Sequence, residues 1–310
     1  MPVSSARSVR PNGAFASLTY RKTRDRIVEA VLLAAGLVAV FTTVAIVIVL
    51  VVESSAFFEH VSIKDFLTDT MWTPLFEDAH YGILPLVAGT LTVTGVALLV
   101  AIPLGTAIAI YLSEFAGHRL REIVKPILEL IGAVPTVVFG YFALLMVTPL
   151  LQKLMPDLPG FNMLSAGLVI GIMIVPYVSS VSEDAMRAVP RYMREGSYAM
   201  GATRLQTALR VVVPGAFSGL AAAFILGISR AVGETMVVAI AAGMQPNLTF
   251  DPREPAATIT AYIVQVSLGD LPHGSIGYQS IFAAGLVLMF LTLIFNIIGF
   301  SLTRRFREAY

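Results

Sequence analysis

The segment 229–235, SRAVGET, places an arginine and a glutamate inside a long apolar stretch. A charged side chain at bilayer depth costs about 2.5–3.5 kcal/mol on insertion scales, so it needs a partner or a water-filled path. Arg230 and Glu234 stand four residues apart, a spacing that on one helical face lets them neutralise each other. One interpretation is a buried ion pair that fixes helix packing. The other is a polar route, also bordered by Ser229 and Thr235, in which Arg230 meets an oxyanion through its planar fork and Glu234 orients it.

A second candidate site is a basic loop outside the apolar segments. Ser180 to Glu183 have the spacing of a capping box and predict a helix that starts directly after them, and Pro190 interrupts that helix. Residues 191–200 are predicted to form a second short helix, and Gly201 supplies the conformational freedom for the turn that follows. Two short helices joined by a glycine make a compact knob. An amphipathic loop whose arginines face anionic lipid headgroups fits the same pattern, and both interpretations are open.

Composition places these sites in a membrane protein. The 310 residues are 56% hydrophobic and only 13% charged, with a mean hydropathy of +0.81, which is too apolar for a soluble domain of this length. The formal net charge of +1 argues against a nucleic-acid-binding protein. No cysteine is present, and the four histidines are scattered singly: His60, His80, His118 and His273. We therefore expect no metal site and no enzyme activity in this chain.

Six apolar segments are long enough to cross the hydrocarbon layer, which takes about 20 helical residues. They lie near residues 27–52, 83–111, 127–151, 164–181, 211–243 and 279–302. The prediction is an all-α polytopic protein with six transmembrane helices, because only internally hydrogen-bonded backbone is stable in lipid. The first segment is too long and too far from the start for a signal peptide, so we expect it to remain as an anchor.

The distribution of cations predicts the orientation. With six crossings, 17 of the 21 lysines and arginines fall on one side, which the positive-inside rule makes cytoplasmic. Both termini and the basic loop are then predicted to be cytoplasmic. On the opposite side, segment 61–82 carries aromatic and aliphatic residues among acids. It fits either an amphipathic helix at the outer interface or a plain loop.

Six motifs now carry a family resemblance. In chain order they are 82–90 (GILPLVAGT), 133–140 (AVPTVVFG), 162–167 (NMLSAG), 182–190 (SEDAMRAVP), 194–206 (REGSYAMGATRLQ) and 230–235 (RAVGET). Together they resemble the C-type permease subunit of phosphate (Pst) ABC importers, over about residues 80–300. Glu195, Gly201 six positions later and Pro214 have the spacing found in the EAA loop of ABC-importer permeases, which this segment resembles. The usual Glu-Ala-Ala of that loop reads Glu-Gly-Ser at residues 195–197.

The resemblance implies the type I ABC-importer permease fold, which is MetI-like. It also implies a division of the chain into a cytoplasmic tail (1–26), a first transmembrane helix with its outer loop (27–79), a five-helix permease core (80–303) with a cytoplasmic coupling loop (182–213), and a cytoplasmic carboxyl end (304–310). The protein is then expected in the bacterial inner membrane as one half of a permease heterodimer.

The same resemblance implies a function and a set of partners. The chain is expected to form the phosphate path through Ser229, Arg230, Glu234 and Thr235. It is expected to couple to an ATPase through Glu195, Gly196, Ala199, Gly201, Ala202 and Pro214. The implied partners are a second permease (PstA-like), an ATPase dimer (PstB-like) and a phosphate-binding protein (PstS-like), which is periplasmic or lipid-anchored. ATP and Mg²⁺ would be used by the ATPase and no cofactor by this chain, which has no glycine-rich nucleotide loop.

Two alternatives remain. A permease for another oxyanion, such as sulfate or molybdate, is the nearest one. An ion-coupled secondary transporter is further away, because such proteins place charged residues in repeated halves and no second copy of segment 229–235 is found.

Overall fold

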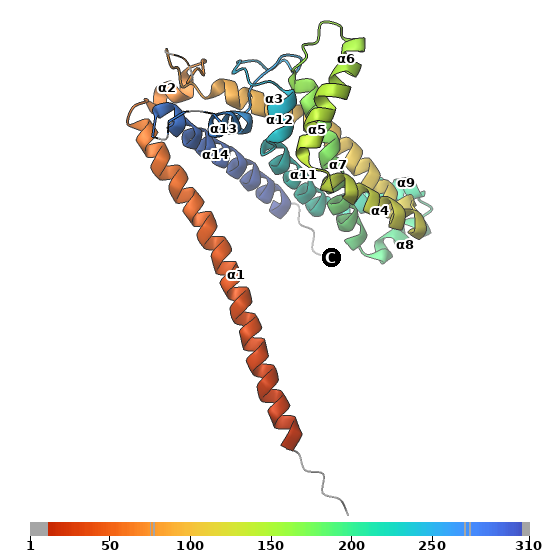
Figure 1. Cartoon of the computed structure of the whole chain (residues 1–310). Helices are drawn as coiled ribbons and strands as arrows, with labels where there is room; N and C mark the ends of the chain where they lie inside the picture. Colours follow the sequence, from red (N-terminus) through yellow and green to blue (C-terminus); the bar gives the residue numbers. More distant parts are fainter. Residues whose placement is uncertain (1–11, 75, 77, 270, 273, 306–310) are drawn as a thin grey trace, which may run out of the picture. The chain divides into compact units, whose positions relative to one another are not determined.

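The computed structural model describes residues 12–74, 76, 78–269, 271–272 and 274–305. Within these residues the secondary structure is helical, and the only extended pairing is a single bridge between Trp72 and Tyr81 (Figure 1). The elements are α1 Asn12–Phe58, α2 Ile63–Thr68, α3 Leu84–Ile110, η1 Tyr111–Phe115, α4 His118–Ala133, α5 Thr136–Phe142, η2 Ala143–Val147, α6 Thr148–Leu154, α7 Met163–Ala188, α8 Arg191–Ala199, α9 Arg204–Thr207, η3 Ala208–Val212, α10 Val213–Gly215, α11 Phe217–Val232, α12 Met236–Ala241, α13 Ile259–Ser267 and α14 Ile276–Arg305. The expected all-α fold is confirmed.

The chain forms two compact units, which divide between Val52 and Glu53. In the first unit, residues 22–52 form one continuous helix whose apolar side chains are nearly all exposed. No other element belongs to this unit in the described residues, so the helix has nothing of its own unit to pack against. The second unit holds all the remaining elements.

Among the residues that the structure describes, five helices are long and apolar enough to cross a membrane, at residues 22–58, 84–115, 136–154, 163–188 and 276–301. A sixth crossing is counted if the bent pair 204–215 and 217–232, which meet at 74°, forms one span. The third span begins at residue 136 and not at 127, as the hydropathy had suggested. Val134 is extended (φ −65°, ψ 133°) because it precedes Pro135, so α4 ends there as a separate helix.

Helices α3 and α7 form the centre of the second unit, and small residues let them approach closely. A Cβ on Gly171 would lie 2.7 Å from Val100 Cβ, and one on Gly167 would lie 2.7 Å from Val96 Cβ. The small-residue spacing of 167 and 171 is therefore a packing device. Around it lies a buried apolar cluster that includes Ile170 and Ile174.

A second cluster lies at the end of the unit where α2 and α13 are found. Phe57, Phe66, Trp72, Tyr81 and Tyr262 contact one another edge to face, with ring centroids 5.0–6.2 Å apart. Segment 61–82 is helical only over α2, and its Phe66 and Trp72 are buried within this cluster. The segment is therefore folded onto the protein and is not one amphipathic helix at an interface.

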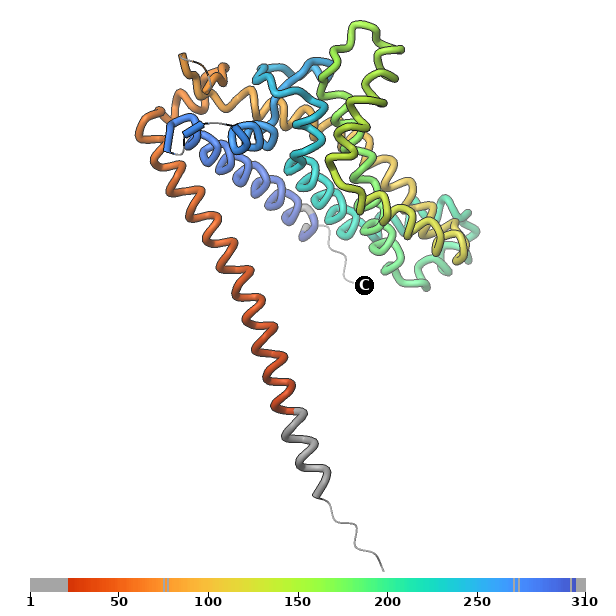
Figure 2. Tube along the Cα trace, viewed as in Figure 1, coloured from red at the N-terminus to blue at the C-terminus, as the bar shows by residue number. Residues whose placement is uncertain are grey.

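The path of the chain in Figure 2 brings α4, α8 and α9 to one end of the second unit, remote from α2 and α13. Helix α14 runs beside α11, and α12 continues from α11 toward the end that holds α13. The polar segments predicted to lie on opposite sides of the membrane thus lie at opposite ends of this unit.

Candidate translocation path and docking region

Arg230 lies deep in the span formed by α11. It stands 13 residues after Phe217, the first residue of α11, which at 1.5 Å per residue is about 20 Å along the helix axis. The helix ends two residues later at Val232, and Gly233 occupies its carboxyl cap. Residues 233–235 then interrupt the span before α12 begins, so the arginine lies directly before a helix break.

The Arg230 guanidinium lies over an aromatic ring and not beside a carboxylate. Its central carbon is 4.2 Å from the centroid of the Tyr177 ring on α7. Its Nε is buried and has no hydrogen-bond partner, and no described acidic side chain lies within ion-pair distance of it. Tyr177 is itself fixed, because its hydroxyl donates to Gly132 O at 3.0 Å. A cation–π contact holds the guanidinium in place but leaves its charge uncompensated.

Glu234 has a different role from the one its spacing suggested. Its Oε1 accepts hydrogen bonds from Met236 N at 3.2 Å and Val237 N at 3.4 Å, the first backbone donors of α12. The side chain is 8% exposed, and its backbone carbonyl accepts from Thr260 Oγ1 at 2.7 Å. The predicted Arg230–Glu234 ion pair is therefore wrong. The helical face that would bring the two together ends at Val232, and the glutamate caps the next helix instead.

Ser229 and Thr235 flank this break. Ser229 Oγ donates to Asn296 Oδ1 on α14 at 3.3 Å, and Thr235 Oγ1 donates to Gly233 O at 3.2 Å. Tyr177 and Asn296 are further residues of this site that were not predicted from the sequence. Asn296 is an amide inside the last apolar segment, a signal that could have found it, whereas nothing in the sequence pairs Tyr177 with an arginine 53 residues away.

The basic loop folds as the knob of short helices that was one of the two expectations. Residues 189–212 are named the knob here; they comprise α8, the turn at Gly201 with φ 81°, α9 and η3. Thr203 and Gln206 form a capping box at the start of α9. The capping box expected at Ser180 is absent, because α7 continues unbroken from Met163 to Ala188 and buried Ser182 and Glu183 lie in its interior.

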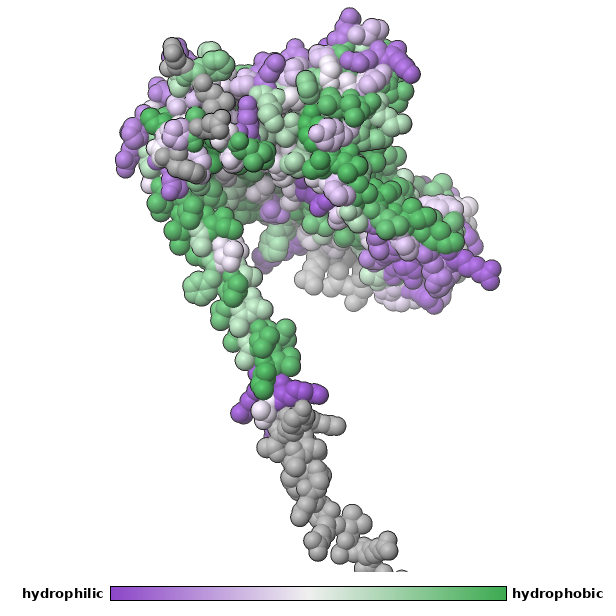
Figure 3. Space-filling view, in the orientation of Figure 1, coloured by the Kyte–Doolittle hydropathy of each residue, from purple (hydrophilic) through white to green (hydrophobic). Residues whose placement is uncertain are grey.

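The expected docking residues lie largely on the surface of this region. Glu195, Gly196, Ala199, Gly201 and Pro214 are exposed, and Ala202 is half-buried. Large apolar side chains are exposed beside them: Tyr192, Tyr198, Met200, Leu205 and Leu209. Met200 is 88% exposed, at the point where α8 turns into Gly201. In Figure 3 the α8–α9 end is strongly hydrophilic and lies next to the green, hydrophobic surface of the spans.

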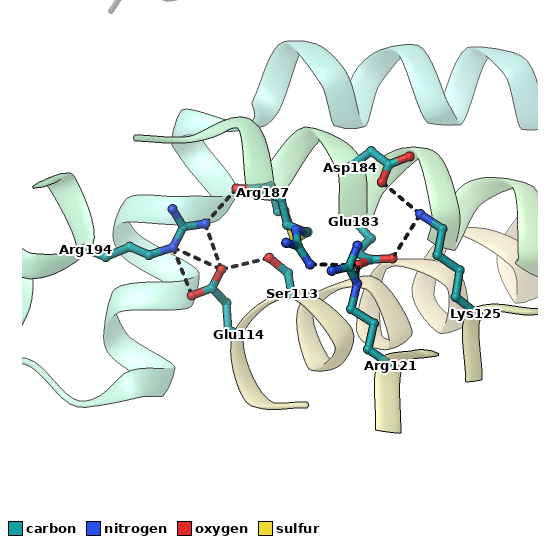
Figure 4. A network of polar contacts seen from close by, with 9 residues as sticks. Ser113, Glu114, Arg121, Lys125, Glu183, Asp184, Arg187 and Arg194 are labelled. Carbon is teal, nitrogen blue, oxygen red and sulfur yellow. Dashed lines mark hydrogen bonds and ion pairs between the residues drawn. The ribbon is translucent and has the colours of Figure 1, made fainter. Parts of the chain in front are cut away.

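Two buried carboxylates form ion pairs at the end of the second unit where α4 and the knob lie (Figure 4). Glu183 on α7 is fully buried and forms ion pairs with Arg121, with Lys125 Nζ at 3.6 Å and with Arg187 Nη1 at 3.9 Å. Lys125 Nζ also lies 2.9 Å from Asp184 Oδ1. Because Arg121 and Lys125 belong to α4, these pairs hold α4 against α7.

The second carboxylate is Glu114 in η1, directly after α3. Its side chain is only 4% exposed, and Arg194 Nη2 lies 3.0 Å from its Oε1. Ser113 Oγ donates to the same oxygen at 2.8 Å. Arg194 also donates from Nη1 to Val189 O at 2.6 Å and from Nη2 to Met186 O at 2.7 Å. Glu114 was not among the residues predicted from the sequence to be functional.

Comparison with known proteins gives the family. Residues 101–308 match the family described as binding-protein-dependent transport system inner membrane component. The chain is 36% identical to the probable ABC transporter permease protein YqgH of Bacillus subtilis, over 84% of this chain and 85% of that protein. It is 34% identical to the phosphate transport system permease protein PstC 1 of Mycobacterium tuberculosis, over 73% of each chain.

Solved structures give the same fold. A bacterial ABC transporter involved in the import of the acidic polysaccharide alginate aligns with a TM-score of 0.65 at 18% identity, over 94% of this chain and all of that chain. The methionine ABC transporter MetNI, in an inward-facing conformation, aligns with a TM-score of 0.54 at 19% identity, over 73% of this chain and 95% of that one. The helical spans thus belong to an ABC-type permease architecture, and this chain is a member of the binding-protein-dependent transport system inner membrane component family.

Proposed function

We propose that this chain is the transmembrane permease subunit of an ATP-driven importer of inorganic phosphate. The observation that carries the proposal is Arg230, a guanidinium about 20 Å inside the span with an aromatic ring below it and no acidic side chain of the described residues beside it. A permanent positive charge in a polar path favours an anion. The relatives named for phosphate transport support phosphate as that anion.

The chemistry of Arg230 fits transient binding of a phosphate ion. The guanidinium presents donors in a planar fork, which matches two oxygens of a tetrahedral oxyanion. Tyr177 holds the fork by its π face, a contact that leaves the edge donors available. Among the described residues, Arg230 is a single cation without further charged donors beside it, so it attracts the phosphate ion but does not hold it too tightly to be released. Ser229, Thr235 and Glu234 shape the helix break at this point, and they complete the proposed path.

The exposed knob supports coupling to an ATPase. Glu195, Gly196, Ala199, Gly201, Ala202 and Pro214 mark the proposed contact surface. The exposed apolar side chains around Met200 provide the desolvated centre that a stable protein contact needs. ATP and Mg²⁺ are bound by the ATPase pair, and this chain contributes movement. A second permease and a phosphate-binding protein complete the assembly.

The charge distribution supports the orientation. The knob and α4 carry six of the twelve arginines of the second unit, and cytoplasmic loops are enriched in such residues. The knob therefore faces the cytoplasm and the α2–α13 end faces outward, in a bacterial inner membrane. Both termini lie on the cytoplasmic side in this arrangement.

Uptake of labelled phosphate by vesicles that contain the reconstituted complex tests the proposal. Phosphate accumulation should require ATP on the side of the ATPases and should fall strongly in Arg230→Gln. Arg119→Gln, at an exposed arginine on α4, is the matched control and should retain uptake. Uptake without ATP would refute the energy source, and uptake of sulfate in place of phosphate would refute the substrate.

A further inference from the structure

Helix α8 bears no buried residue, so little of its surface is attached to the rest of the molecule. Its apolar attachment is through Met193, which packs against a buried cluster that includes Met186, Val189 and Val212. Two further side chains of α8 are half-buried. Ser197 Oγ lies 2.9 Å from Thr207 Oγ1 of α9, a contact within the knob, and Arg194, whose side chain is 16% exposed, reaches outside the knob. An element attached at so few points transmits motion through those points.

Arg194 distributes its donors over two elements, η1 and the carboxyl end of α7. Its Nε and Nη2 donate hydrogen bonds to the Glu114 carboxylate in η1, at 3.0–3.3 Å. Its Nη1 and Nη2 also donate to the carbonyls of Val189 and Met186, at the carboxyl end of α7. In the described part of the chain, the hydrogen bonds and ion pairs that join α8 to α7 or η1 all come from this one side chain.

We propose that Arg194 is a positioning residue for transport, a rigid link through which movement of α8 is passed to the ends of the α3–η1 and α7 spans. The inference rests on the proposed function for the source of that movement, the ATPase. Only arginine fits the position, because a planar five-donor group can grip a carboxylate and two carbonyls at once. Lysine would keep the charge but has a single nitrogen, so it cannot span the three acceptors.

The buried Glu114 carboxylate is fixed to its own span, so a displacement of Arg194 is passed on to that span. Glu114 is 4% exposed and is held from its other side by Ser113 Oγ, so it does not follow Arg194 independently of the α3–η1 span. Because one carbonyl acceptor belongs to Met186 in the last turn of α7 and the other to its C-cap Val189, a pull on the guanidinium acts on both spans together. Helix α7 carries Tyr177, which lies against Arg230. The same link therefore connects the knob with the arginine of the path.

The experiment uses the complete complex and compares Arg194→Lys and Arg194→Gln with Arg119→Gln. Both Arg194 variants should still co-purify with the ATPase and hydrolyse ATP, but the phosphate transported per ATP should fall about tenfold or more, as expected for lost hydrogen bonds to a charged group. Glu114→Gln should lower the same ratio, because it weakens the same grip. An unchanged ratio in the Arg194 variants, with normal uptake by the wild type, would overturn the inference and leave the proposed function intact.

A second readout does not depend on the substrate. The chain has no cysteine, so spin labels can be placed at Arg191→Cys on α8 and Leu104→Cys on α3 without removing native thiols. The distribution of distances between the two spin labels should stay narrow, with an unchanged mean, when ATP is trapped on the wild-type complex, because α8 and α3 move together. In Arg194→Gln it should broaden and shift with ATP. A distance that stays narrow and unchanged in that variant would refute the link, even if phosphate proved to be the wrong substrate.

Discussion

The guanidinium carbon of Arg230 lies 4.2 Å from the centroid of the Tyr177 ring, and this contact joins α11 to α7 in the middle of the spans. The ring provides orientation without neutralising the charge. A carboxylate in the same place would have competed with an entering anion, whereas a π face does not.

Replacing Tyr177 with leucine should therefore lower phosphate uptake, because the guanidinium loses its support. A cation–π contact contributes about 0.5–2 kcal/mol, which corresponds to an effect of about 2- to 30-fold. Tyr177→Phe keeps the ring and loses only the hydroxyl bond to Gly132 O, so it should stay within about twofold of wild type. Initial rates of labelled-phosphate uptake measure both. Equal losses in the two variants would show that the hydroxyl, and not the ring, is what matters.

Substitutions of Glu234 can show whether its side chain acts as a helix cap or as a counter-charge to Arg230. Its Oε1 accepts from Met236 N and Val237 N, a role that the neutral amide oxygen of glutamine can also fill. Glu234→Gln should thus retain most transport, and Glu234→Ala should lose stability by about 1 kcal/mol, the usual cost of removing a cap. Uptake and the apparent melting temperature in detergent report the two effects. If both variants abolished uptake equally while remaining folded, the negative charge itself would be required.

The sequence predicted the helical class, the apolar spans and the knob because these depend on local signals. Apolar runs of bilayer length, Pro190 and Gly201 act within a few residues of themselves. The third span was placed too early because hydropathy averages over Pro135, although the proline itself marks the end of α4.

The partners of the charged residues could not be predicted in this way. Arg230 meets Tyr177 from 53 positions away, and Glu114 meets Arg194 from 80, so only the packing of α3, α7 and α8 brings these pairs together. The spacing of Arg230 and Glu234 was a valid helical signal, but the helix stops between them. An i, i+4 rule holds only where the helix continues through both residues.

Glu183 is expected to dominate the stability of the α4–α7 contact. It is fully buried among Arg121, Lys125 and Arg187, so Glu183→Gln leaves cations without their central partner. Breaking a buried ion pair from one side costs about 3–5 kcal/mol. The neighbouring Asp184→Asn is the control: its side chain is 63% exposed, and an exposed pair contributes about 0–1 kcal/mol. Thermal unfolding in detergent should separate the two variants clearly, and similar melting temperatures would contradict this assignment.

The α2–α13 end contains a titratable contact outside the spans. His80 Nδ1 lies 2.9 Å from Asp69 Oδ2, and this hydrogen bond raises the pKa of His80 and lowers the pKa of Asp69. A raised histidine pKa contributes stability that is fully present below about pH 6.5 and is lost as the pH rises through the folded-state value. The lowered aspartate pKa acts in the other direction and costs stability only in acid, as the pH falls below about 3.9. Loosening of this loop is therefore expected above neutral pH.

Trp72 reports that change, because it is the single tryptophan of the chain and is buried in the same loop. Quenching of its fluorescence by acrylamide should increase as the pH is raised from 6 to 9. In His80→Gln the quenching should be independent of pH over this range, because the titrating group is gone. A wild-type profile that is equally flat would show that the His80–Asp69 contact does not govern the loop.

Close packing of α3 on α7 predicts opposite effects for two glycines of this pair. A methyl group on Gly171 would lie 2.7 Å from Val100 Cβ and 2.8 Å from Ala97 O, so Gly171→Ala must separate the helices and should cost about 1–3 kcal/mol. Gly95 lies within α3 and has nothing within 4 Å of the position of a Cβ, so Gly95→Ala should be neutral or stabilise by about 0.5–1 kcal/mol. The melting temperature in detergent should fall for Gly171→Ala and should stay unchanged or rise for Gly95→Ala. Because the two changes add the same methyl group to the same helix pair, equal shifts would mean that α3 and α7 are not in contact at Gly171.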